Sequence, residues 1–183
     1  MLRVAEHFKA AKLHLVGLSM GGRIARNVAL RRPERLHSLT LVSSTPGFDA
    51  LSAERVKQFV TERSSRTPQT LQRLLGSRAS RAAYEELRDS VSRIHEASYQ
   101  KTLEASVAQD RAAPIEQIRV PTLVIAGEED TVYPPELARA MAQRIPGAKL
   151  LMLEGTGHLA NLEQPERFNQ ALLDFLTRQE APS

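Results

Sequence analysis

Several residue types that define common protein classes are absent or scarce in this chain. None of the 183 residues is cysteine, which excludes disulfide bonds and thiolate-bound metals. Tryptophan is absent, aromatic residues make up only 4%, and basic residues alternate with acidic ones, so the net charge of +4 does not favour nucleic-acid binding. No apolar run approaches the ~20 residues of a membrane-spanning helix, and residues 1–7 lack the apolar core of a secretory signal. We therefore expect a cytoplasmic protein with no nucleic-acid and no membrane partner.

The apolar residues, 42% of the chain, follow an alternating pattern of strands and helices. Short apolar, β-branched runs predict strands over residues 13–16, 36–43, 122–126 and 149–153. Helical spacing predicts helices over residues 2–12, 135–145 and 165–178. A further helix is expected to begin after Ser19 and to stop at Pro33. In the helix after Ser19, the apolar face is expected to contain Ile24, Ala25, Val28 and Ala29. Repeated strand-helix-strand units favour an α/β fold with about four parallel strands covered by helices.

Between these halves, residues 47–113 show no strand pattern. Helical stretches are predicted there over residues 53–61, 82–94 and 97–107. We expect a core of residues 1–46 and 114–183 and a helical insertion of residues 47–113. Residues 51–111 contain 11 basic and 8 acidic residues, so most of the net positive charge of +4 lies in this middle segment.

The sequence Gly-Leu-Ser-Met-Gly at residues 17–21 joins a predicted strand to a predicted helix. A sharp turn of this kind exposes the serine hydroxyl as a nucleophile, and crowding in the turn is expected to require Gly17 and Gly21. The backbone N–H of Met20 is the expected first oxyanion donor, and Gly22 should let the helix pack closely. A phosphate-binding loop would need a Lys-Ser/Thr pair or a dinucleotide glycine triplet, and neither is present. Ser19 is therefore the predicted nucleophile.

A serine nucleophile needs a base and an acid on later loops. The predicted base is His158, which follows a strand and a glycine-rich turn, whereas the remaining histidines have no such position: His7, His14, His37 and His95. Three acids compete after the strand at 122–126. Asp130 is favoured because the turn that follows can fix a short side chain, while Glu128 and Glu129 are expected to face solvent. No histidine and carboxylate cluster has metal-ligand spacing, so no metal and no cofactor are expected.

These motifs resemble the α/β-hydrolase superfamily, and the segments at residues 17–22, 121–130 and 157–165 look most like 3-oxoadipate enol-lactonase and its relatives. The resemblance implies that residues 47–113 form a helical cap that selects the substrate. It also implies several strands, a helix and a His-Gly loop before the nucleophile strand, and none of these precedes Leu13. We therefore expect an N-terminally truncated, partial hydrolase fold, which lacks one oxyanion donor and leaves the strand at 13–16 as an unpaired edge that is prone to self-association.

Three functions are compatible with these features. The first is a serine hydrolase that cleaves a small carboxylic ester or lactone, for which 3-oxoadipate enol-lactone is one candidate, through Ser19, His158 and Asp130. The second is a truncated, weakly active or non-catalytic remnant that acts as a binding or partner-dependent module. The third keeps the fold but changes the reaction to carbon–carbon bond hydrolysis, thioester cleavage or perhydrolysis.

Overall fold

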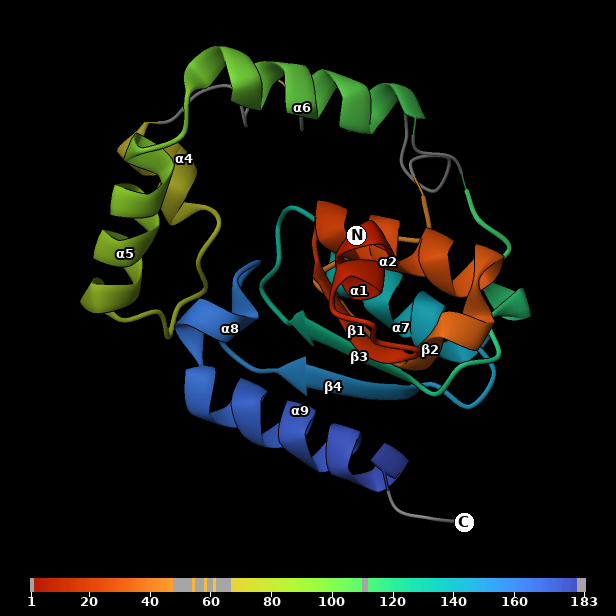
Figure 1. Cartoon of the computed structure of the whole chain (residues 1–183). Helices are drawn as coiled ribbons and strands as arrows, with labels where there is room; N and C mark the ends of the chain where they lie inside the picture. The colour runs from red at the N-terminus through yellow and green to blue at the C-terminus, as the bar shows by residue number, and fades with distance from the viewer. Residues whose placement is uncertain are drawn as a thin grey trace.

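The described part of the chain contains a four-stranded parallel sheet with helices on both faces (Figure 1). The structure, a computed structural model, describes residues 2–47, 67–109 and 112–180, together with the isolated positions 54, 58 and 61. The strands lie in the order β1-β2-β3-β4, and their bounds are β1 Leu13–Leu18, β2 Leu36–Val42, β3 Thr122–Gly127 and β4 Lys149–Leu153. Each neighbouring pair is parallel. The predicted α/β architecture of about four parallel strands covered by helices is confirmed.

One face of the sheet is covered by two helices, α2 (Met20–Arg31) and α7 (Pro135–Arg144). Ala29 of α2 and Met141 of α7 are buried in one cluster with Leu39 and Leu41 of β2. The two leucines are two residues apart, so they project from the same side of the strand. The short 3₁₀ helices η1 (Pro33–Arg35) and η3 (Ile115–Gln117) lie just before β2 and β3.

The opposite face is covered by α9 (Pro165–Glu180), which follows the single-turn helix α8 (Ala160–Glu163) (Figure 1). Phe168 and Phe175 of α9 are buried with Val42, Ile125 and Leu153 from three neighbouring strands. Burying both faces explains why the strands are nearly continuous apolar runs, which is typical of parallel sheets.

Two details of the predicted helices are wrong. Helix α1 covers only Leu2–His7 and not residues 2–12, because Lys9 has a left-handed φ of 54° that ends the helical path. In α2, Ile24 is 50% exposed, while Arg26 is only 1% exposed. The guanidinium of Arg26 donates a 2.8 Å hydrogen bond to the carbonyl oxygen of Thr45, and this bond offsets part of the cost of its burial.

In the described residues from 67 to 109, the helices between β2 and β3 are α4 (Pro68–Gln72), α5 (Arg81–Ser92) and α6 (Glu96–Gln109). The side chains of Thr67 and Ser80 accept a backbone N–H at the N-termini of α4 and α5. Helices α4 and α5 lie to one side of the sheet and α6 extends across the top in Figure 1. Most of the helix predicted over residues 53–61 lies outside the described residues. Among the described residues, no helix has the length and apolar character needed to cross a membrane.

Candidate active site

Three loops meet at one edge of the sheet. Parallel strands place their carboxyl ends at the same edge, which is where ligands of α/β proteins usually bind. Ser19 follows β1 directly, Asp130 lies three residues after β3, and His158 lies five residues after β4. The topology therefore brings together residues that are 28 to 139 positions apart in the sequence.

Ser19 lies in a strained turn between β1 and α2. Its φ of 53° and ψ of −118° are unusual for a residue other than glycine. Hydrogen bonds tie the turn to the end of β2 and the residues after it: the Ser19 N–H donates to Val42 O at 2.8 Å, and the Ser44 hydroxyl donates to Ser19 O at 3.0 Å. Although Ser19 precedes α2, its side chain makes no capping hydrogen bond. The Ser19 hydroxyl is therefore available to another partner.

The three glycines around this turn have different roles. A Cβ at Gly17 would lie 2.6 Å from the carbonyl carbon of Gly21, so the backbone approach requires glycine there. A Cβ at Gly22 would meet the Ser44 side chain at 2.5 Å, in agreement with the expected close packing of the helix. At Gly21, however, nothing lies within 4 Å of the Cβ position outside the local helix backbone. The predicted crowding at Gly21 is wrong.

His158 connects Ser19 to Asp130. Its Nε2 is 3.0 Å from Ser19 Oγ, and its Nδ1 is 2.9 Å from Asp130 Oδ2. An ionised carboxylate can only accept hydrogen bonds, so Nδ1 carries the proton and the neutral Nε2 can accept the Ser19 hydroxyl proton. The imidazole is 1% exposed and Asp130 is 2% exposed, which keeps both groups away from competing water.

Asp130 is fixed by its own loop. Its Oδ1 accepts the backbone N–H groups of Val132 at 2.8 Å and Tyr133 at 2.9 Å, which leaves Oδ2 for His158. The Tyr133 ring also packs edge-on against the imidazole, with 5.7 Å between ring centroids. These contacts hold both the acid and the imidazole in one orientation.

The two acids that precede Asp130 are exposed, as expected. The Glu129 carboxylate accepts hydrogen bonds from the Ser77 hydroxyl at 2.7 Å and the Ser77 N–H at 2.6 Å. These bonds, with a smaller contribution from the charge of Arg78, lower the pKa of Glu129 from its ordinary value. Sequence reasoning missed this contact because Ser77 belongs to the segment between α4 and α5, 52 residues away.

A developing negative charge beside Ser19 would face the start of α2. Met20 is the first residue of that helix, and the first N–H groups of a helix have no intrahelical acceptor. Together with the positive end of the helix dipole, these N–H groups suit an oxyanion. In the described part of the chain, no group of three or more histidine and acidic side chains is arranged to hold a metal ion.

The other histidines lie away from this chemistry. His14 Nδ1 is 2.8 Å from Ser38 Oγ, and its ring stacks on that of His37 with 5.2 Å between centroids. His7 packs edge-on against Phe8, and His95 is exposed. The described arginines of the predicted insertion are also exposed: Arg73, Arg78, Arg81, Arg88 and Arg93. Arg55, Arg63 and Arg66 lie outside the described residues.

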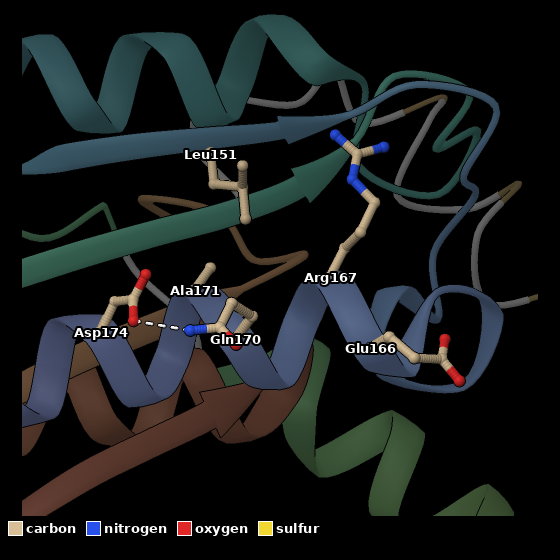
Figure 2. A pocket seen from close by; sticks show the side chains of 6 residues that line it. All are labelled: Leu151, Glu166, Arg167, Gln170, Ala171 and Asp174. Atoms are coloured by element: carbon tan, nitrogen blue, oxygen red, sulfur yellow. Dashed lines mark hydrogen bonds between the residues drawn. The ribbon is translucent and has the colours of Figure 1, made fainter.

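A surface groove of about 480 Å³ lies between β4 and α9 (Figure 2). It is lined by Leu151, Glu166, Arg167, Gln170, Ala171 and Asp174. Along α9, the amide of Gln170 donates a 2.7 Å hydrogen bond to Asp174, one turn further on (Figure 2). Since Ser19, Asp130 and His158 do not line this groove, it is separate from the candidate active site.

Known proteins are similar to this chain in both sequence and fold. Residues 1–165 match a family described as the alpha/beta hydrolase fold. A 2-hydroxy-6-oxononadienedioate/2-hydroxy-6-oxononatrienedioate hydrolase from Paraburkholderia phymatum is 32% identical over 190 residues, which cover 90% of this chain and 62% of the relative. The chain spans between 49% and 66% of the length of three of its curated relatives.

Two solved structures of similar fold are enzymes by their descriptions. A thermophilic esterase from Thermogutta terrifontis, with malate bound, has a TM-score of 0.81 and 28% identity, over 97% of this chain and 70% of that chain. The enol-lactonase from Burkholderia xenovorans LB400 has a TM-score of 0.79 and 26% identity, over 96% of this chain and 70% of that chain.

Proposed function

The chain belongs to the α/β-hydrolase family, and from this premise we propose that it is a serine hydrolase that cleaves a small carboxylic ester or lactone. One observation carries the proposal. Ser19 Oγ, the His158 imidazole and the Asp130 carboxylate form a continuous hydrogen-bonded chain, with 3.0 Å and 2.9 Å between the bonded atoms. That order and geometry suit an activated nucleophile, its base and the acid that orients the base.

In the proposed reaction, Ser19 Oγ attacks the carbonyl carbon while its proton moves to His158 Nε2. The carbonyl oxygen becomes an oxyanion and accepts the backbone N–H of Met20. When the intermediate collapses, the leaving alkoxide takes the proton from His158 and an acyl-Ser19 ester remains. Water then attacks this ester with His158 again as base, which releases the carboxylic acid and restores Ser19. Asp130 keeps the proton on Nδ1 throughout.

The proposed enzyme consists of a catalytic core and a cap. Residues 1–46 and 114–183 form the catalytic core, and residues 47–113 form a helical cap that selects the substrate. Their division is supported by the described helices α4, α5 and α6, which lie outside the sheet (Figure 1). The similarity to an enol-lactonase supports a lactone, of which 3-oxoadipate enol-lactone is our candidate.

The similarity to the Paraburkholderia hydrolase favours a second candidate, an unsaturated hydroxy-oxo dioate of the kind in that relative's name. Both candidate substrates carry a free carboxylate. A negatively charged substrate suits residues 51–111, where basic residues outnumber acidic ones. The ratio of kcat/KM for the two substrates decides between them. A higher value for the dioate would reject the lactone assignment.

Labelling with a fluorophosphonate probe tests the serine mechanism. We expect the purified chain to be labelled and Ser19→Ala to lose both labelling and ester hydrolysis. Ser92→Ala is the matched control, because Ser92 is an exposed serine on α5, and it should be labelled like the original chain. A folded chain that neither reacts with the probe nor hydrolyses esters would instead support a non-catalytic binding module, and unchanged labelling of Ser19→Ala would reject Ser19 as the nucleophile.

The position of β1 at the edge of the sheet supports self-association, in which a second copy of the chain is the partner. Strand β1 is at one end of the sheet order, and Val16 on it is 42% exposed. An apolar strand edge favours pairing with another edge, and a lysine there opposes it. We expect concentration-dependent association in sedimentation velocity that Val16→Lys reduces. Val4→Lys, on the 59% exposed side chain of α1, is the control, and a monomer at every concentration would contradict the proposal.

A further inference from the structure

The segment of residues 73–78, between α4 and α5, is bound to the loop that carries His158 along most of its length. The His158 N–H donates to the carbonyl oxygen of Leu74 at 2.8 Å. The Arg78 N–H donates to the carbonyl oxygen of Gly155 at 3.0 Å, and the Arg78 guanidinium pairs with Glu154 at 2.8 Å. We call residues 73–78 the joint segment.

Glu163 lies where the joint segment and the His158 loop meet. Its Oε1 accepts the backbone N–H of Leu159 at 3.0 Å, and its Oε2 accepts those of Gly157 at 2.9 Å and Gly76 at 2.6 Å. Two of these donors are the residues immediately before and after His158, and the third belongs to the joint segment. Since hydrogen bonds to a carboxylate are stronger than those between neutral groups, this side chain fixes the backbone on both sides of His158.

The carboxylate is also enclosed. Glu163 is only 8% exposed, although it ends a helix of four residues. Its hydrogen-bond donors within the described part of the chain are backbone N–H groups, so the site is built around the charge rather than around an ion pair. A buried carboxylate is costly unless it is hydrogen-bonded, and here the cost is offset only while both chain segments stay in place.

The backbone of the joint segment lies in close contact with the backbone of the His158 loop. A Cβ at Gly76 would lie 2.6 Å from Gly157 N, and a Cβ at Gly157 would lie 2.6 Å from Leu74 O. Leu71 and Leu75 are buried in a cluster against which Leu159 also packs. The two backbones are therefore in direct contact beside Glu163, with no room for side chains between them.

We propose that Glu163 is a positioning residue for His158, and that it acts by binding the backbone on both sides of His158 to the joint segment. This inference rests on the proposed function, because it assigns Glu163 a role in placing the catalytic base. Glu163 does not touch Ser19 or Asp130 in any hydrogen bond of the described residues; it acts through the loop. Its carboxylate thereby couples the helices of residues 68–92 to the imidazole that must reach Ser19.

Glu163→Gln tests the proposal with little change in size. A carboxamide has one acceptor oxygen and turns an NH₂ donor toward at least one of the three N–H groups, so the loop must shift. We expect kcat, per active site titrated with the fluorophosphonate probe, to fall roughly 10- to 100-fold, as for other residues that orient a functional ligand or base. KM should stay within about twofold, because loss of positioning lowers kcat rather than substrate binding. Glu166→Gln, an exposed glutamate on α9, is the matched control and should keep the original kcat.

A merely structural role gives a different result. Glu163→Gln would then lower the melting temperature while kcat per titrated site stayed unchanged, and that outcome would overturn the proposal. If the variant does not fold, hydrogen exchange of the original chain supplies the test. The amides of Gly76, Gly157 and Leu159 should then be protected together, and free exchange at Gly157 and Leu159 would overturn the anchoring by Glu163.

The exchange measurement also separates this inference from the proposed function. If Ser19→Ala kept full hydrolysis, the serine mechanism would fall, and with it the role of His158 as base. Protection of the same three amides in Ser19→Ala requires no turnover, so it would still support the anchoring of the His158 loop by Glu163. If Ser19→Ala loses hydrolysis and Glu163→Gln has a lower kcat, both the serine mechanism and the positioning role of Glu163 are supported.

Discussion

Replacing Asp130 by asparagine should trap His158 in the wrong tautomer without disturbing the fold. The Asp130 Oδ1 accepts two backbone N–H groups, at 2.8 Å from Val132 and 2.9 Å from Tyr133. The carbonyl oxygen of an asparagine can keep both bonds, which turns its NH₂ group toward His158 Nδ1. That nitrogen must then become an acceptor, so the imidazole proton moves to Nε2, where it points at Ser19 Oγ.

The expected cost follows from this geometry. An Nε2 that already carries a proton cannot accept the proton of Ser19, so the variant loses the base although all three side chains remain in place. In a serine-protease triad the same exchange lowers kcat about 10⁴-fold, which corresponds to about 5 kcal/mol of transition-state stabilisation. Because every buried hydrogen bond retains a partner, the free energy of unfolding should change by less than about 1 kcal/mol.

The assay is the steady-state hydrolysis of a chromogenic ester, with thermal unfolding measured on the same samples. Glu128→Gln is the matched control, because Glu128 is an exposed acid only two residues from Asp130, and it should keep the original kcat. The reasoning is refuted if Asp130→Asn retains kcat within about tenfold while hydrolysis still depends on Ser19. In that case His158 would not need Asp130 to select its tautomer.

Three further variants probe the surroundings of the site. Gly127→Ala should lower kcat by about 100-fold, because its Cβ would overlap the carbonyl oxygen of Gly157 and displace the neighbouring His158 loop; normal turnover would contradict this. Gly21→Ala should fold with a melting temperature equal to or above the original, since nothing lies within 4 Å of its Cβ position, and a large drop would show hidden crowding. The Ser77 hydroxyl lowers the pKa of Glu129 below its ordinary value of 4.5. This carboxylate therefore stabilises the fold above that value and loses the effect as pH falls. Unfolding free energy should therefore depend less on pH in this acid range in Glu129→Gln, and an identical pH dependence would disprove the contribution.

The strands and the meeting of the three loops were predictable from the sequence because each depends on a local pattern. Apolar, β-branched runs such as residues 122–126 have few alternatives to a buried strand. Once the strands are parallel, their carboxyl ends share one edge, so Ser19 and His158 come together although 139 positions separate them. No knowledge of the side-chain packing is needed for that step.

Other features depend on contacts that no local pattern encodes. Helical spacing predicts the buried face of α2 only to within a neighbouring position. It places Ile24 in the core, but Ile24 is exposed, and the buried residue is Arg26, which donates a hydrogen bond to Thr45 O. Glu163 also looks like an ordinary surface residue in the sequence. Its role depends on Gly76, which is 87 positions away in a segment with only helical patterning.

The joint segment explains how a change in the helices could alter catalysis without any contact with the reacting atoms. It is tied to the β3 loop, where Thr131 Oγ1 donates to Arg73 O and Ser77 binds Glu129, and to the β4 loop through Glu163. A displacement of residues 73–78 must therefore break hydrogen bonds to the loops of both the acid and the base. Since a shift of about 1 Å at a catalytic group can cost about 10² in rate, the helices that follow and precede this segment are expected to tune turnover as well as substrate choice.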